Sequence, residues 1–361
     1  MHYTNQLKDT LSQYFTFNKS RLECFSLLIL ALIKVRNVNL SELSQGFNGE
    51  AKLKSKYRRI QRFFDKADIN ISMLSMFIFK LFGVFNKCVY LAMDRTNWKF
   101  GKKNINILLV SIICGSYAVP IYWILLDKRG NSNHKERKLL FEALLKIIDK
   151  SHIAGILADR EFIGKKWFDY LLSRDLPFFI RIKKDLKVEA FKVQLRTDLL
   201  FLDLKESGQK KEFKNILLSG IYVNLSATVN DKGELMIIAT NTDSNNIIET
   251  YRQRWKIETM FGFFKTKGFN FESTHLTDME KISKMIIVIA IAYSWSIKIG
   301  EWKNSIEPIK IKKHGRKEIS IFRYGLDCIR EIILCVNSKT KKNILAFIKM
   351  LSINTKQVSG Y

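Results

Sequence analysis

The chain has 361 residues, of which 61 are Lys or Arg and 34 are Asp or Glu, so its formal net charge is +27 at pH 7. An excess of this size is the electrostatic footprint of a protein that binds a polyanion, and nucleic acid is the expected partner. An acidic membrane is the alternative partner, but we expect no membrane span, because the longest apolar stretch, near residues 285–297, is too short to cross a bilayer and predicts a buried helix.

The first 85 residues predict a separate helical DNA-binding domain. Residues 40–47 and 51–64 form two helical segments around a turn near Asn48-Gly49, an arrangement similar to a helix-turn-helix. The second segment carries five basic residues, Lys54, Lys56, Arg58, Arg59 and Arg62. Charge runs on a helix are more often solvated faces than DNA readers, so both interpretations stay open here. If the helix reads DNA, Arg58, Arg59 and Arg62 are the candidate contacts.

The next hundred residues predict a mixed α/β core. Apolar runs at 88–93, 105–114 and 118–126 predict a three-stranded meander, and Asn131-Ser132-Asn133 offers an N-cap for a helix over 135–148. A strand, a helix and a short strand are then predicted over the ranges 153–158, 164–172 and 177–181. The resulting β-β-β-α-β-α-β order fits a mixed sheet that helices cover on both faces.

The segment from 183 to 245 predicts an inserted small β domain. Strand-like runs at 221–229 and 234–240 flank Asn230-Asp231-Lys232-Gly233, which suits a hairpin turn. Four aromatic residues of this segment could either pack in a core or form stacking surfaces: Phe191, Phe201, Phe213 and Tyr222. Packing in the core of the small domain is the interpretation that we favour for these aromatics, and exposed stacking surfaces are the alternative.

Two aspartates lie where apolar strands are predicted to stop. Asp94 follows the run 88–93, Asp159 follows the run 153–158, and each is followed by an arginine. A single aspartate in such a place is usually a loop residue or a helix cap. Two with the same neighbour favour a shared site, since carboxylates at the ends of strands can meet.

Four polar residues between Tyr251 and Lys265 are predicted to share one face of a helix. At about 100° per residue, Tyr251, Arg254, Glu258 and Lys265 fall within an arc of about 60° on one predicted helix. Such a face could hold a metal ion and bind DNA phosphates. The alternative is a solvated amphipathic helix, whose apolar residues we expect to be buried in either case. These residues are Trp255, Ile257, Met260, Phe261 and Phe264.

Asp94, Asp159 and Glu258, the last within a Tyr-x2-Arg-x3-Glu-x6-Lys run, resemble the motifs of the DDE transposases of bacterial insertion sequences, in the class with the Y-R-E-K signature. The resemblance covers roughly residues 40–300 and rests on three separated motifs in the expected order. It implies an RNase H-like catalytic core with Asp94, Asp159 and Glu258 as catalytic residues. Tyr251, Arg254 and Lys265 would bind phosphates of the scissile strand.

Three converging carboxylates repel one another unless divalent cations neutralise them, and hard oxygen ligands suit Mg²⁺, with Mn²⁺ as a substitute. We expect two ions, one to activate water or a DNA 3′-hydroxyl and one to stabilise the leaving oxygen. The histidines form no ligand pair in the sequence; they are His2, His134, His152, His275 and His314. The five cysteines form no metal-type pair and are expected to be reduced and structural.

The resemblance further implies a cut-and-paste transposase that binds terminal inverted repeats, cleaves at the element ends and joins them to target DNA as a homodimer on paired ends. The insertion would help to hold the transposon end, where some relatives stack a flipped base on a tryptophan; this chain has none between Trp167 and Trp255. A metal-dependent nuclease without strand transfer and a non-catalytic DNA-binding relic are the alternatives, and an intact triad argues against the relic. The amino-terminal region contains the acidic Asp9 and no basic-then-apolar export segment. We therefore expect a cytoplasmic, nucleoid-associated bacterial protein.

Five segments are therefore expected. They are a helical DNA-binding domain (1–85), the first part of the RNase H-like core (86–182), the β insertion (183–245), the Glu helix with the following helix (246–300), and a basic C-terminal helical region (301–361). The basic residues of the last region would contact DNA or a second protomer. They are Lys303, Lys310, Lys312, Lys313, Arg316 and Lys317.

Overall fold

The computed structural model describes residues 2–313, 315–335 and 338–352. The chain divides into two compact units, a sheet unit of residues 84–260 and a helical unit of residues 1–83 with 261–361. This grouping differs from the five expected segments, because the first helices and the last helices pack together in one unit.

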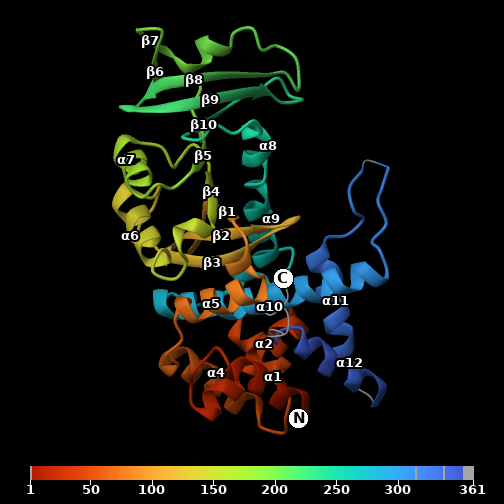
Figure 1. The fold of residues 1–361 in the computed structure, drawn as a ribbon. Coiled ribbons are helices and arrows are strands. Elements are labelled where there is room, and N and C mark those ends of the chain that lie inside the picture. The colour runs from red at the N-terminus through yellow and green to blue at the C-terminus, as the bar shows by residue number, and fades with distance from the viewer. Residues whose placement is uncertain (1, 314, 336–337, 353–361) are drawn as a thin grey trace. The chain divides into compact units, whose positions relative to one another are not determined.

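The sheet unit contains one ten-stranded sheet with the order β3-β2-β1-β4-β5-β10-β9-β8-β6-β7 (Figure 1). Its strands are β1 (Val89–Phe100), β2 (Lys103–Cys114), β3 (Tyr117–Leu125), β4 (Ile153–Ala158), β5 (Phe178–Ile182), β6 (Lys187–Ala190), β7 (Val193–Arg196), β8 (Lys210–Leu218), β9 (Ile221–Val229) and β10 (Leu235–Thr240). Its helices are α6 (His134–Leu144), α7 (Lys165–Ser173) and α8 (Ile247–Arg252), and α9 (Trp255–Phe264) contains the boundary between the units.

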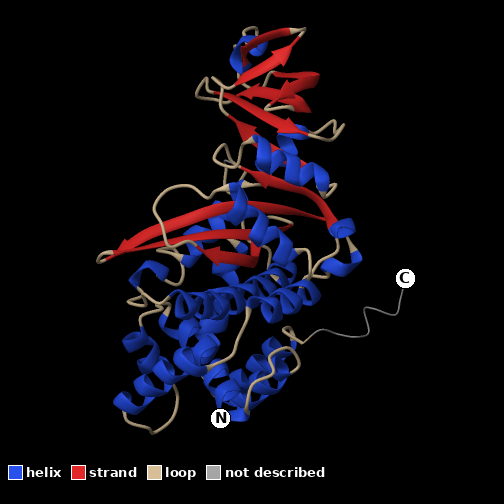
Figure 2. Ribbon diagram, turned by 90° about the vertical axis from the view of Figure 1, so that its left-hand side faces the viewer, coloured by secondary structure: helices blue, strands red, loops and turns tan. Residues whose placement is uncertain are grey.

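The first five strands have the expected RNase H-like topology. β2 pairs antiparallel with both β1 and β3, and β1 and β2 form a long hairpin (Figure 2). β1, β4 and β5 are parallel neighbours. The parallel strands are apolar along almost their whole length because helices cover both faces, α6 and α7 on one side and α8 on the other (Figure 1). The prediction of an α/β, RNase H-like mixed-sheet core is confirmed.

The segment 183–245 is rich in β structure, but its strands continue the core sheet and do not form a sheet of their own. β10 pairs antiparallel with β5, from Ile237 opposite Ile182 to Thr240 opposite Phe179. The edge of β5 would otherwise leave its backbone N–H and C=O groups without partners, and β10 satisfies them. The hairpin turn at 230–233 forms as predicted, with Asn230 N–H donating to Glu234 O.

The core interpretation of the inserted aromatics is wrong for two of them. Phe201 is buried and its ring packs on Phe213, but Phe191 is 77% exposed and Tyr222 is 69% exposed. Phe191 lies at the turn between β6 and β7, where its backbone is left-handed. Tyr222 alternates along β9 with buried neighbours, so its ring points to the solvated face of the sheet.

The helices of the helical unit are α1 (His2–Ser12), α2 (Lys19–Val35), α3 (Leu40–Gly46), α4 (Leu53–Lys66), α5 (Ile71–Leu81), α10 (Met279–Ile306), α11 (Ile321–Leu334) and α12 (Ser338–Lys349). α10 packs against α2, α4, α5 and α11 and is buried along most of its length, as predicted for an internal helix. It is longer than the apolar run suggested. Among the described residues, α10 is long and apolar enough to cross a membrane, as is the bent pair α2–α3 if it is taken as one span, but 89% of the apolar stretch of α10 is buried inside the molecule.

α10 and α11 approach each other closely at two glycines. A Cβ atom on Gly300 would lie 2.0 Å from the carbonyl oxygen of Ile321, and one on Gly325 would lie 1.8 Å from that of Ser296. Both atoms would clash with backbone, which cannot turn aside as a side chain can. The helix crossing therefore requires glycine at both positions.

We expect Gly325→Ala to lower the free energy of unfolding by about 1–3 kcal/mol, because the added methyl group forces α10 and α11 apart. The midpoint of urea unfolding measures this loss. Gly262→Ala in α9 is the matched control, since its Cβ would meet only Lys267 Cδ at 3.5 Å and alanine favours a helix. Equal stability of the two variants would contradict the close crossing.

Candidate active site

The sheet register brings the two predicted aspartates together. β1 and β4 are parallel neighbours whose pairing ends at Met93 opposite Ala158; Asp94 is the next residue of β1, and Asp159 is the first residue after β4. The prediction that this strand stops at Asp94 is wrong, because β1 continues to Phe100 in the hairpin with β2. Asp94 therefore lies inside a strand, at the level where the neighbouring strand ends.

The run that carries the third carboxylate is two helices and not one. α8 ends at Arg252, α9 begins at Trp255, and between them Arg254 N–H donates to Tyr251 O in a turn. The prediction of one continuous helix is wrong, because helical periodicity in the sequence runs through the break without a glycine or proline to mark it. The break places Arg254 at a bend, with Tyr251 before it and Glu258 after it.

Arg254 connects all three predicted catalytic residues. Its Nη1 donates to Asp94 Oδ2 at 3.3 Å and its Nη2 donates to Glu258 Oε1 at 2.5 Å. Its Nε donates to the Tyr251 hydroxyl at 3.1 Å, and that hydroxyl donates to Asp159 Oδ1 at 3.3 Å. One guanidinium thus bonds two carboxylates directly and reaches the third through a tyrosine.

The network is largely removed from solvent. The Arg254 side chain is only 7% exposed, and burial lowers its pKa, but Tyr251, Asp94 and Glu258 outweigh this effect and raise it, so the guanidinium stays charged. Burial raises the pKa of Asp94 to about 6, against the lowering effect of Arg254. Burial also raises the pKa of Tyr251 to about 12, so its hydroxyl remains a proton donor. The alternative of a solvated helical face is therefore wrong for Tyr251 and Arg254, which are both buried.

Two arginines that the sequence analysis did not single out as site residues hold the loop after β4. Arg95 pairs with both oxygens of Glu161 at 3.1 Å, and Arg137 donates to Glu161 O at 2.8 Å and to Ser132 O at 2.6 Å. Asp159 begins this loop, so the two arginines restrain its position. The sequence does contain a feature that indicates a buried role for Arg137. It lies on the apolar face of α6, in register with the buried leucines three and seven residues later.

The remaining residues of the predicted helical face lie elsewhere. Lys265 follows α9 and pairs within the helical unit with Glu272, at 2.7 Å between Nζ and Oε1. Ile257 and Met260 are buried as predicted, but Trp255 is 63% exposed, so its assignment to the buried side is wrong. It is the first residue of α9, at the outside of the bend.

Comparison with known proteins decides the family. Residues 87–295, more than half of the chain, match a family model described as "Transposase DDE domain". The chain belongs to the DDE transposase family.

No curated protein matches the chain. Among solved structures, a piggyBac transposase synaptic complex with hairpin DNA has 12% identity and a TM-score of 0.47, with 92% of this chain and 76% of that chain covered. The NurA nuclease from Sulfolobus solfataricus has 12% identity and a TM-score of 0.27, with 65% and 93% covered. Both scores are below 0.5, so neither likeness bears on function.

The carboxylates of this transposase have the right chemistry for a divalent metal ion, on which DDE transposases in general depend. Mg²⁺ and Mn²⁺ prefer hard oxygen ligands such as carboxylates. Among the described residues, however, no three Asp, Glu, His or Cys side chains are gathered closely enough to hold an ion. Asp94 and Glu258 are instead both bonded to the guanidinium of Arg254.

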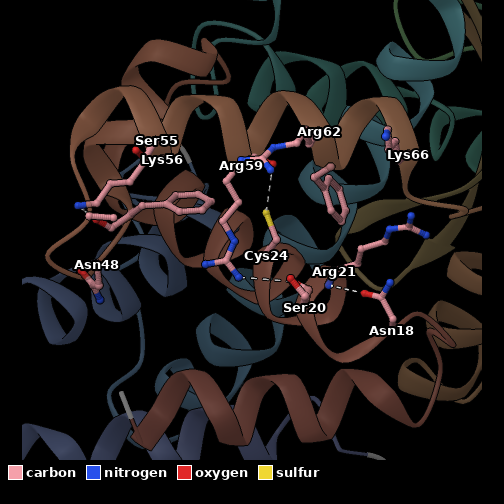
Figure 3. Close-up of a pocket in the computed structure, with 13 residues that line it drawn as sticks. Asn18, Ser20, Arg21, Cys24, Asn48, Ser55, Lys56, Arg59, Arg62 and Lys66 are labelled. Atoms are coloured by element: carbon pink, nitrogen blue, oxygen red, sulfur yellow. Dashed lines mark hydrogen bonds between the residues drawn. The ribbon is translucent and has the colours of Figure 1, made fainter.

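The N-terminal helices of the transposase line a basic pocket of about 500 Å³ that is open to solvent (Figure 3). α4 forms one wall, and the basic residues that line it are Arg21, Lys56, Arg59, Arg62 and Lys66. Arg59 pairs with Glu23 at 3.1 Å and donates to Ser20 O, so it joins α4 to α2. Arg58 and Arg62 are exposed on α4, which follows α3 as a second helix after a turn.

We expect Arg137→Met to lower the free energy of unfolding by about 2–3 kcal/mol, because buried carbonyl oxygens lose a charged donor. Thermal and urea unfolding measure the change. Lys135→Met, an exposed position two residues earlier on α6, is the matched control and should leave stability unchanged. A loss of less than about 0.5 kcal/mol for Arg137→Met would show that the loop is held by other contacts.

Proposed function

We propose that this DNA transposase cuts a bacterial insertion sequence of the Y-R-E-K class from donor DNA and joins its 3′-OH ends to target DNA. Asp94, Asp159 and Glu258 would hold two Mg²⁺ ions, which Mn²⁺ can replace. The observation that carries this proposal is the convergence of the three carboxylates on one hydrogen-bonded network through Arg254 and Tyr251. Residues from two strands and a helix, up to 164 positions apart, meet there.

Each part of the chain then has a role in the reaction. When bound, the ions activate the attacking water or 3′-hydroxyl and stabilise the leaving oxygen. Asp94 and Asp159 are fixed by parallel strands with buried apolar side chains, so their backbones cannot drift apart. Arg95 and Arg137 hold the loop after Asp159. Tyr251, Arg254 and Lys265 would bind phosphates of the scissile strand, with the planar guanidinium suited to a bidentate contact.

The strands inserted between Asp159 and Glu258 would hold the transposon end. Phe191 and Tyr222 are exposed aromatic rings on this part of the sheet, which suits stacking on nucleobases. Lys192 follows Phe191 in the turn between β6 and β7, and Lys214 lies on β8, which pairs with β9; both are exposed and suit backbone phosphates. These two rings replace the tryptophan that some members of the family use.

The N-terminal helices would bind the terminal inverted repeats as duplex DNA, through Arg58, Arg59 and Arg62. Arg58 and Arg62 are exposed and would contact phosphates, while Arg59 mainly joins α4 to α2 through Glu23. Two copies of the chain on paired ends would form the active complex, because both ends must be joined in one event. Such a protein would work at the nucleoid in the bacterial cytoplasm.

We expect Asp94→Asn, Asp159→Asn and Glu258→Gln each to lower Mg²⁺-dependent cleavage by more than about a hundredfold, since even partners of metal ligands contribute 10–100-fold. The substrate is a labelled duplex with the inverted repeat that brackets the gene, and joining to a plasmid distinguishes a transposase from a nuclease. Duplex affinity should change little, because phosphate contacts elsewhere supply most of it. The exposed control Asp169→Asn on α7 should cleave normally. Residual cutting near the wild-type rate would remove that residue from the site.

A separate prediction concerns α4. Arg58→Ala and Arg62→Ala should weaken duplex binding and reduce the slope of log affinity against log salt by about 0.9 for each phosphate that the variant no longer neutralises. Fluorescence anisotropy between about 50 and 200 mM salt, a range across which the affinity from phosphate contacts falls steeply, measures both quantities. Lys166→Ala, an exposed change of equal charge on α7, is the control. An unchanged slope in both arginine variants would exclude this face of α4 from the DNA interface.

A further inference from the structure

Arg254 has more partners than a phosphate-binding side chain needs. All three nitrogens of its guanidinium donate to groups of the site, and the side chain is 7% exposed. A residue whose sole role is to bind incoming DNA would be expected to reach solvent. Here the charged group is instead turned inward, on to the carboxylates that the proposed metal ions require.

Electrostatics gives a reason for this geometry. Buried or half-buried carboxylates repel one another strongly at low dielectric, and a paired cation removes much of that cost. Three carboxylates and one guanidinium leave the site with a net charge of −2. Two divalent ions would turn that charge to +2, which repels Arg254 from the carboxylates and attracts a DNA phosphate.

We propose that Arg254 is the built-in counter-ion of the metal-free site, and that it must leave Asp94 and Glu258 before divalent ions can bind there. This proposal rests on the metal site proposed above. The bend between α8 and α9 allows the exchange, because Arg254 lies in a turn where its backbone is not part of either helix. Tyr251 extends the effect to Asp159, since its hydroxyl bonds both side chains.

One consequence is coupling between metal and DNA. A phosphate beside the site offers the released guanidinium a new partner, so DNA lowers the cost of its release and raises the affinity for metal ions. Linkage requires that metal ions raise the affinity for DNA by the same factor. Arg254 would thereby disfavour a metal-loaded site in the absence of DNA.

The test is Mn²⁺ binding to the full chain without DNA, measured by calorimetry and by electron paramagnetic resonance of free Mn²⁺. Arg254→Gln should bind Mn²⁺ about tenfold more tightly than the wild type, a difference of about 1.4 kcal/mol, because the competing cation is gone. Arg252→Gln, which removes an exposed arginine two residues earlier, should bind as the wild type does. Equal or weaker binding by Arg254→Gln would overturn the proposal.

Thermal melts give a second readout. Without Mn²⁺, Arg254→Gln should melt below the wild type, and Mn²⁺ should raise its melting temperature by more than it raises that of the wild type. If Arg254→Gln does not fold, Tyr251→Phe replaces it, since that change removes only the hydroxyl that links Arg254 to Asp159. Tyr251→Phe should bind Mn²⁺ more tightly than the wild type by a smaller factor, and unchanged binding would count against the proposal.

Asp94→Asn separates this proposal from the function on which it rests. If Asp94→Asn binds Mn²⁺ as well as the wild type does, the metal site itself is wrongly assigned. If Asp94→Asn no longer binds Mn²⁺ while Arg254→Gln is unchanged, the metal site stands and the counter-ion role fails. Absence of binding in Asp94→Asn together with tighter binding in Arg254→Gln supports both.

Discussion

Carboxylates that converge in a half-buried site need a cation among them, and the guanidinium of Arg254 meets that need within the sheet unit. The rest of the site is arranged around this contact. Parallel pairing of β1 and β4 sets Asp94 beside Asp159, and the bend after α8 turns Arg254 toward Asp94 and Glu258. Tyr251 completes the network by bonding Arg254 and Asp159 through a single hydroxyl.

The scaffold around this network is rigid for ordinary reasons of packing. Central strands with buried apolar side chains carry the aspartates, and a capping box at Asn133 fixes the start of α6. From α6, Arg137 reaches across to the backbone of the loop after Asp159. This rigid frame and the guanidinium of Arg254 together hold the like-charged carboxylates in place despite their mutual repulsion.

Local signals in the sequence predicted much of the core. Apolar runs located β4 at residues 153–158 and β9 at residues 221–229, because strands buried on a face must be apolar there. Non-local pairing was not predictable in this way, since nothing near residues 235–240 indicates that β10 joins β5. The break at Arg254 was missed for a related reason. Its partner Asp94 lies 160 residues away and outweighs the local preference for a continuous helix. The exposure of Trp255 follows from the same break.

A crystal of the protein grown with Mn²⁺ and measured at the manganese absorption edge would test the central claim most directly. The account predicts an anomalous peak in contact with Asp94, Asp159 and Glu258, with the Arg254 guanidinium no longer bonded to Asp94 or Glu258. A peak away from these carboxylates would contradict the metal site. A peak at the carboxylates with both Arg254 contacts unchanged would contradict the role of Arg254 as the counter-ion that the ions displace.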